Sequence, residues 1–144
     1  MLSAKMQEQQ CLEYAMKKFG VGWKETAELP ELAGYRRYVS AQMFTTAGAG
    51  KLKITKNDRH VYLNYIIDAV KHPQEMWVDS SDPRDKTLYC LAQYRMKPRT
   101  LRVVCTFKET SVDVWLGWSA YQDDRSLDSE YEKKRSGRRV YVAA

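Results

Sequence analysis

Arg59 and His60 are the residues whose types and position most directly suggest chemistry, because they stand together at the start of a predicted helix. A guanidinium at a helix N-terminus can bind phosphate together with the backbone N–H groups of the first turn. The same position favours the neutral form of a histidine, which suits a general base. The alternatives are a salt bridge for Arg59 and an exposed surface position for His60. The other histidine, His72, stands beside Pro73 at the predicted helix end and is interpreted as structural or exposed.

Four further side chains could complete a site for phosphate chemistry. Glu75 could act as a general base or orient Arg59, or it could be a strand carboxylate paired at the surface. Arg95 and Ser119 project by alternation from one face of predicted strands, where they could hold a phosphate. Ser119 could equally be a turn hydroxyl at a strand end. Tyr121 could stack a base or act as a general acid, although a tyrosine at a sheet edge often only packs.

The charge of the chain favours an anionic partner. Lysine and arginine number 24 and acidic residues 18 in 144 residues, which gives a net charge of +6. Nucleic acid or an acidic protein would fit this charge, and a merely soluble basic surface is the alternative. The positive residues form two clusters, Lys51, Lys53, Lys56 and Arg59, and Lys133, Lys134, Arg135, Arg138 and Arg139. Among them, Lys53, Lys56 and Arg135 are the candidate phosphate-binding residues.

Cysteines and apolar runs exclude several classes of protein. The three cysteines, Cys11, Cys90 and Cys105, are odd in number and widely spaced, which argues against a disulfide scaffold and a zinc site. We therefore expect reduced, buried thiols, no metal and no other cofactor. No apolar run approaches the ~18 residues of a membrane span, and residues 1–10 lack the apolar core of a secretory signal. The chain could still be part of a larger exported or packaged protein.

Hydrophobic periodicity predicts two helices before a sheet. Residues 3–19 place apolar side chains on one helical face, and Gly20 and Gly22 end that helix. Residues 58–70 carry a second stripe, with Asn57 or Asp58 as the cap and Pro73 after the end. The two stripes are Met6, Leu12, Ala15, Met16 and Phe19, and Tyr62, Leu63, Ile66, Ile67 and Val70.

The rest of the chain predicts an antiparallel meander. Strands are expected over 34–40, 75–79, 87–96, 101–108, 112–119 (continued by Tyr121) and 139–142, with turns at 97–99 and 109–110 and a short helix over 128–135. The helix over 58–70 should pack on one sheet face, formed by Leu88, Cys90, Val103, Cys105, Val114 and Leu116. The other face is semi-polar, with Gln93, Arg95, Thr106, Ser119 and Tyr121. This pattern predicts an α+β fold in which N-terminal helices pack on a twisted antiparallel β-sheet. We expect one domain, in which an amphipathic helix within residues 1–20 joins the body formed by 21–144.

Three stretches of the chain resemble a known family pattern. The first resembles a lysine-rich lead, an arginine, a helix and a Pro-x-Glu-(apolar)-Trp strand. It consists of Lys53-Ile54-Thr55-Lys56-Asn57-Asp58-Arg59, then Tyr62-Leu63, then His72-Pro73-Gln74-Glu75-Met76-Trp77. Ser119-Ala120-Tyr121-Gln122 is similar to a Thr-Ala-(aromatic)-Gln segment, with serine keeping the hydroxyl. Tyr131 with Lys133, Lys134, Arg135, Gly137 and Tyr141 is similar to a closing Tyr…Arg-x-Gly…Tyr stretch. Over residues 34–142 the chain thus resembles the phage-associated barnase/EndoU/colicin E5-D/RelE-like nuclease family, second type, often appended to phage head-morphogenesis proteins.

This resemblance implies a barnase/EndoU-like nuclease that cleaves RNA without a metal. The ribose 2′-OH would attack the adjacent phosphorus and leave a 2′,3′-cyclic phosphate and a 5′-OH, so the site needs proton-transfer groups and cations. A toxin or phage-delivered effector acting in the cytoplasm would fit, with an acidic immunity protein as a partner. The alternatives are a non-catalytic nucleic-acid- or protein-binding module of a virion or effector, and a nucleotide-using transferase with an arginine–glutamate site. The scarcity of groups that titrate near neutrality favours the binding module.

Overall fold

The computed structural model describes residues 4–45, 56–96, 99–123 and 130–144. These residues form a seven-stranded sheet in the order β1-β2-β6-β5-β4-β3-β7, with short helices around it. The strands are β1 (Ala27–Glu28), β2 (Arg36–Val39), β3 (Glu75–Asp79), β4 (Thr87–Arg95), β5 (Thr100–Ser111), β6 (Val114–Asp123) and β7 (Arg138–Val142). The α-helices are α1 (Ala4–Lys18), α2 (Leu63–Lys71) and α3 (Glu130–Lys133), and the 3-10 helices are η1 (Ala41–Phe44), η2 (Lys56–Tyr62) and η3 (Lys134–Ser136).

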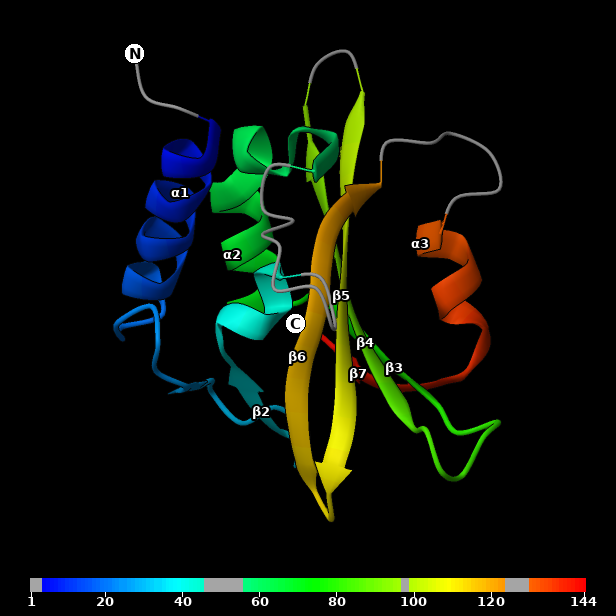
Figure 1. The fold of residues 1–144 in the computed structure, drawn as a ribbon. Coiled ribbons are helices and arrows are strands. Elements are labelled where there is room, and N and C mark those ends of the chain that lie inside the picture. Colours follow the sequence, from blue (N-terminus) through cyan, green and yellow to red (C-terminus); the bar gives the residue numbers. More distant parts are fainter. Residues whose placement is uncertain (1–3, 46–55, 97–98, 124–129) are drawn as a thin grey trace.

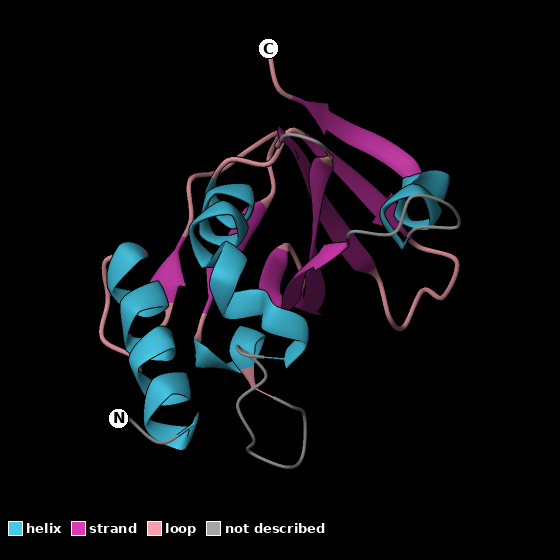
Figure 2. Cartoon of the chain, turned by 90° about the horizontal axis from the view of Figure 1, so that it is seen from above, coloured by secondary structure: helices cyan, strands magenta, loops and turns pink. Residues whose placement is uncertain are grey.

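The architecture confirms the predicted α+β class. Adjacent strands pair antiparallel except β2 and β6, which run parallel over a short stretch. The helices α1 and α2 lie on one side of the sheet and α3 on the other (Figure 1). The view from above shows the same division, with the sheet between the two layers of helices (Figure 2). None of the helices in the described ranges is long and apolar enough to cross a membrane.

The core lies between the sheet and the two N-terminal helices. From α1, Leu12, Ala15 and Met16 are buried, as the predicted stripe requires; the side chain of Met6 lies outside the described residues. From α2, Leu63, Ile66, Ile67, Ala69 and Val70 are buried. Each fully buried aliphatic side chain of this kind stabilises the fold by roughly 1.5–3 kcal/mol. This packing fixes the position of η2, the segment that carries Arg59 and His60.

The helix predicted over 58–70 is two elements in the structure. Residues 56–62 form the 3-10 helix η2, and the α-helix begins only at Leu63. The change coincides with the start of the buried stripe, since Val61 is 64 % exposed whereas Leu63 is buried. Tertiary packing stabilises the α-helix from Leu63 onward, and a 3-10 turn is common at such a helix start. The side chains of the predicted caps, Asn57 and Asp58, lie outside the described residues.

The predicted inward face of β6 is wrong, because this strand contains a β-bulge. Val114 and Leu116 were expected in the core, but Trp115 is 4 % exposed and Trp118 is 38 % exposed. Trp118 is the extra residue, because Phe107 pairs with Gly117 and Thr106 with Ser119. A bulge reverses the alternation beyond it, so strict period-two counting fails there. A Cβ on Gly117 would lie 2.7 Å from the Met43 Cε atom, which explains the glycine in this crowded position.

Other predicted boundaries shift by a few residues. The hairpin turn between β5 and β6 is at Val112–Asp113 rather than 109–110, because β5 continues pairing to Ser111. Asp113 takes a positive φ of 61°, which aspartate tolerates better than most residues. The short strand β1 lies before residue 30, where no strand was predicted. The last helix lies at 130–136 as α3 and η3, while residues 97–98 and 128–129 of the predicted turn and helix are outside the described ranges.

The buried positions predicted for Cys90 and Cys105 are confirmed. They face each other as a register pair of β4 and β5, and Cys11 is half-buried. Burial raises the pKa of Cys90 to about 11, and burial together with Cys90 raises that of Cys105. Thiolates are the reactive species, so we expect Cys90 and Cys105 to resist a thiol reagent in the native protein at pH 8. The same reagent under denaturing conditions should titrate all three cysteines. A count below three would contradict reduced thiols, and rapid native labelling of Cys90 would contradict its burial.

Candidate functional site

Arg59 reaches from η2 onto β6 and stacks on Tyr121. The guanidinium carbon lies 5.4 Å from the centre of the tyrosine ring. Desolvation by burial lowers the pKa of Arg59, although the interaction with Tyr121 acts in the opposite direction. The buried Nε atom of Arg59 has no hydrogen-bond partner among the described residues. A guanidinium stays protonated even so, and Arg59 is therefore a half-buried cation with donors left to offer.

Two other arginines, the buried Arg37 and the half-buried Arg135, donate to defined acceptors. Arg37 is fully buried and donates to the carbonyl oxygens of Val70 at 2.6 Å and Lys71 at 3.3 Å, at the C-terminal end of α2. Arg135 binds both carboxylate oxygens of Glu75 at 3.0 Å. In the described part of the chain, no carboxylate pairs with Arg59. Since a buried charge is stabilised by an opposite charge, Arg59 differs from Arg37 and Arg135 in being able to take an anionic ligand.

Ser119 and Tyr121 lie on the same sheet face at this site. Both follow the bulge on β6, and they pair with Thr106 and Val104 of β5. Residues two apart on a strand are separated by roughly 6.5 Å, so the two hydroxyl-bearing side chains are neighbours. The structure thus brings together Arg59, Ser119 and Tyr121. All three were predicted site residues, and a bulge next to them is a common device for aiming side chains at a ligand.

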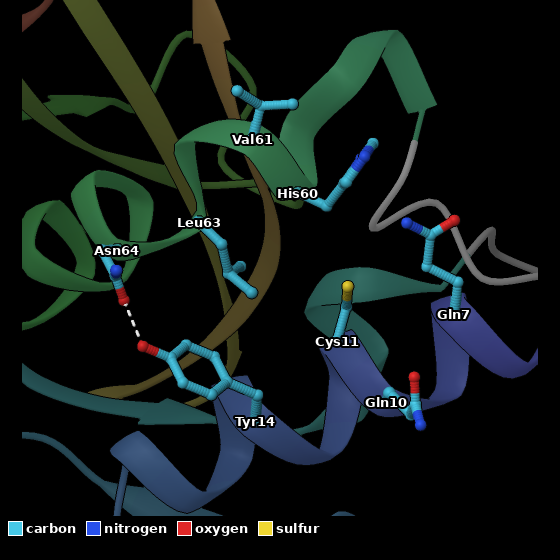
Figure 3. A pocket seen from close by; sticks show the side chains of 8 residues that line it. All are labelled: Gln7, Gln10, Cys11, Tyr14, His60, Val61, Leu63 and Asn64. Atoms are coloured by element: carbon cyan, nitrogen blue, oxygen red, sulfur yellow. Dashed lines mark hydrogen bonds between the residues drawn. The ribbon is translucent and has the colours of Figure 1, made fainter. Parts of the chain in front are cut away.

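His60 points away from this group. Successive residues of a 3-10 helix are about 120° apart, so Arg59 and His60 face different directions. His60 lines a pocket between η2 and α1, and its buried Nδ1 atom has no hydrogen-bond partner among the described residues (Figure 3). His72 is exposed at the C-terminal cap of α2, as predicted. Because His60 lines this pocket, its role as a general base beside Arg59 stays a prediction.

Glu75 and Tyr121 belong to one row of paired residues that crosses the sheet, and they lie three strands apart. The register connects Tyr121 to Val104, Val104 to Leu91 and Leu91 to Glu75, a span of roughly 14 Å at normal strand spacing. The partner of Glu75 is Arg135 rather than Arg59. Tyr131 of α3 is buried against Leu91 and Val104, between the two ends of the row. Glu75 and Arg135 therefore anchor η3 on β3 and form no single cleft with Arg59.

The remaining predicted cations are distributed around the semi-polar face. Arg95 is exposed and pairs with Thr100 near the far end of the β4–β5 hairpin. Lys53 and the side chain of Lys56 lie outside the described residues. On the β3 side, Lys134 lies over the ring of Tyr89 at 5.0 Å and Arg139 over that of Trp77 at 6.0 Å. These cations could form an electrostatic track for a polyanion rather than a catalytic group.

Sequence reasoning missed Arg102 and Asp123. Arg102 lies over the Tyr131 ring at 5.8 Å, and Asp123 accepts a hydrogen bond of 2.9 Å from the Tyr131 backbone N–H. The two residues are register partners on β5 and β6. The available signal was the same alternation that indicated Ser119 and Tyr121, extended two residues further along β6. Together they hold α3 against the face that carries the site.

The Glu75–Arg135 pair has a measurable structural role. Glu75→Gln is expected to lower the free energy of unfolding by about 0.5–1 kcal/mol, because the Arg135 side chain is 34 % exposed and solvent weakens the pair. Chemical denaturation measures this loss. Glu132→Gln is the matched control, since Glu132 also contacts Arg135, at 3.4 Å, but is 53 % exposed and should contribute less. Loss of activity in Glu75→Gln at unchanged stability would instead place Glu75 in the chemistry.

Comparison with known proteins gives one family match. The family described as phage-Barnase-EndoU-ColicinE5/D-RelE like nuclease2 matches residues 15–142. No curated protein and no solved structure matches. Within the described residues, no group of three or more potential metal-ligating side chains occurs. The match includes Arg59, Ser119, Tyr121, Glu75 and Arg135, and begins inside α1.

Proposed function

Since the chain belongs to the phage-Barnase-EndoU-ColicinE5/D-RelE like nuclease2 family, we propose that it is a metal-independent endoribonuclease. The ribose 2′-OH attacks the adjacent phosphorus, the bond to the 5′ oxygen breaks, and the products carry a 2′,3′-cyclic phosphate and a 5′-OH. The observation that carries this proposal is Arg59, a half-buried cation stacked on Tyr121 without a carboxylate partner among the described residues. Such a group fits the scissile phosphate better than a solvated lysine does.

Each residue near Arg59 has a role in the proposed reaction. Arg59 binds a non-bridging phosphate oxygen and stabilises the charge that develops on the phosphorane. Ser119, on the same face, donates a hydrogen bond to a second oxygen. Tyr121 transfers a proton at the attacking or the leaving oxygen while its ring supports the guanidinium. The cations Lys134, Arg139 and Arg95, together with Lys53 and Lys56, attract the rest of the RNA.

The experiment is incubation with total RNA in the presence and absence of a chelator, followed by end-group analysis. The proposal requires cleavage that survives the chelator and leaves 2′,3′-cyclic phosphate ends. Cleavage that the chelator abolishes would contradict metal independence, and 3′-OH products would contradict 2′-OH attack. DNA of the same sequence is the matched substrate control, because it lacks the attacking hydroxyl.

A binding module is the second candidate, and the placement of His60 and Glu75 favours it. His60 lines a separate pocket and Glu75 pairs with Arg135, so among the described residues neither candidate proton-transfer group contacts Arg59 or Tyr121. In this alternative Arg59 and the surrounding cations hold RNA or an acidic protein without turnover. Binding of RNA by a protein that leaves it intact would favour this reading.

The biological setting that fits an active enzyme is a toxin or phage-delivered effector that acts on cytoplasmic RNA. Such an enzyme requires protection of the producing cell, and an acidic immunity protein covering Arg59 and the basic residues around it would supply this. The net charge of +6 supports such electrostatic pairing. Co-expression with acidic candidate proteins encoded beside the gene tests it, since protection should require direct binding.

A further inference from the structure

The pocket between α1 and η2 has no role in the phosphate site described above. Its volume is about 280 Å³, and its lining comes from α1, η2 and the start of α2: Gln7, Gln10, Cys11, Tyr14, His60, Val61, Leu63 and Asn64. In Figure 3 Gln7 and Cys11 rise from α1 towards the segment that carries His60, and Tyr14 points to Asn64. The lining residues from α1 precede the range of the family match, so family membership assigns this pocket no function.

The lining offers hydrogen bonds but no charge. The side-chain amide of Gln7 has no hydrogen-bond partner among the described residues, and the amide oxygen of Asn64 accepts from the Tyr14 hydroxyl at 2.6 Å, which leaves its amide nitrogen to donate. Burial raises the pKa of the Cys11 thiol, which is therefore neutral. Among the described lining residues, a phosphate or a metal ion would find no acidic or permanently basic side chain. The chemistry fits a neutral, polar ligand that both donates and accepts.

His60 supplies the second, independent observation. Its Nδ1 atom is buried in the folded chain without a hydrogen-bond partner among the described residues. Leaving such an atom unsatisfied costs roughly 1–3 kcal/mol. A ligand in the pocket would offset this cost once the imidazole turns towards it, because the atom is buried in the present arrangement. Val61 and Leu63 add apolar surface beside it. A polar atom next to apolar walls is the usual arrangement of a small-molecule pocket.

Size and position restrict the ligand further. A volume of about 280 Å³ is just below the roughly 300–1,000 Å³ of pockets for drug-sized ligands, so a single heterocycle fits better than a larger molecule. Amide side chains recognise base edges through paired donors and acceptors. His60 directly follows Arg59 on η2, so the pocket and the phosphate site adjoin the same short segment. The neutral pocket and the cationic site thus match the two parts of a nucleotide.

We propose that the α1–η2 pocket binds one unpaired nucleobase of the RNA and sets the base preference of the enzyme. The inference rests on the proposed nuclease function, and it assigns His60 to substrate recognition rather than to proton transfer. Single-stranded RNA presents unstacked bases to such pockets, and their edges are read by polar side chains. The α1 helix therefore acts as a specificity element next to the phosphate site.

The test is titration of the full chain with adenosine, guanosine, cytidine and uridine, followed by NMR. Nucleosides lack phosphate, so their binding is independent of Arg59. We expect one nucleoside to bind saturably and better than the other three, and Gln7→Ala and Asn64→Ala each to weaken its binding about fivefold or more. Gln9→Ala is the matched control, because Gln9 hydrogen-bonds Glu13 on the same helix at 3.3 Å and does not line the pocket. Absence of saturable binding, equal binding of all four nucleosides, or unchanged affinity in both pocket variants would overturn the proposal.

The pocket and the nuclease activity can fail separately. If total RNA is cleaved but no nucleoside binds, the pocket proposal is wrong and the nuclease proposal stands. If one nucleoside binds selectively but RNA stays intact, the pocket is supported and the binding module replaces the enzyme. If both hold, Asn64→Ala should change which base flanks the cleaved bond, whereas Gln9→Ala should leave that preference unchanged.

Discussion

Replacing Arg59 by alanine is expected to lower the rate of RNA cleavage by about 10²–10³-fold, the usual effect of removing one donor that stabilises transition-state charge. Arg59 has no carboxylate partner among the described residues, so its loss leaves no opposite charge unpaired there. The free energy of unfolding should accordingly change little. Single-turnover cleavage of a short RNA, measured beside chemical denaturation, separates the two effects.

Two variants control this prediction. Arg59→Lys keeps the positive charge but not the planar fork, so its rate should lie between those of the unmodified protein and Arg59→Ala. Arg84→Ala removes an arginine whose side chain is 96 % exposed in the turn between β3 and β4, and it should cleave normally. A rate for Arg59→Ala equal to that of Arg84→Ala would remove Arg59 from the site.

The fold could be predicted to the extent that local patterns decided it. Alternation in β4 and β5 identified Cys90, Val103 and Cys105 as core residues because both strands are regular and half-covered. The prediction for β6 failed at Trp118, where a bulge inserts a residue that no local pattern reveals. Gly117, next to the bulge, lies close to Met43, a residue distant in sequence, and such a contact is a property of the tertiary structure.

The sequence predicted the types of residue in the candidate site, but not which of those residues lie together in the fold. Arg59 precedes the buried stripe of α2, and Ser119 and Tyr121 alternate on one strand, so these positions followed from periodicity. The position of Glu75 relative to them depends on strand order, because β4 and β5 intervene. The direction of His60 follows from its place next to Arg59, because adjacent residues of an α-helix or a 3-10 helix face directions about 100–120° apart. Strand order arises from packing, which a single sequence specifies only indirectly.

The sheet also gives Glu75 and Tyr121 different surroundings although they share a face. Tyr131 on α3 is buried over the middle of that face, and Asp123 and Arg102 hold it there. The β3 end, with Glu75 bound by Arg135, is therefore an anchoring region. The β6 end keeps hydroxyl groups beside Arg59, so the proton-transfer group should be sought there.

Tyr121→Phe tests that assignment with the least disturbance. Phenylalanine keeps the ring below Arg59 and removes only the hydroxyl, so substrate binding should be retained. If Tyr121 transfers a proton, the cleavage rate should fall by about 10²–10⁴-fold and one limb of the pH profile should disappear. Tyr89→Phe is the matched control. Tyr89 lies on the same sheet face, on the strand that pairs with β3, and the Lys134 Nζ atom lies 5.0 Å from the centre of its ring.

His60→Ala is the opposing measurement. With His60 in the α1–η2 pocket, its loss should raise KM or change the base preference, while kcat keeps both limbs of its pH profile. Proton transfer by His60 would give the reverse result, a fall in kcat of about 10²–10⁴-fold at nearly unchanged KM. If Tyr121→Phe cleaves at the normal rate and His60→Ala shows this fall in kcat, the proton-transfer role belongs to His60 instead of Tyr121. It would also require η2 to turn when RNA binds, because His60 in the present arrangement lines the α1–η2 pocket rather than the phosphate site.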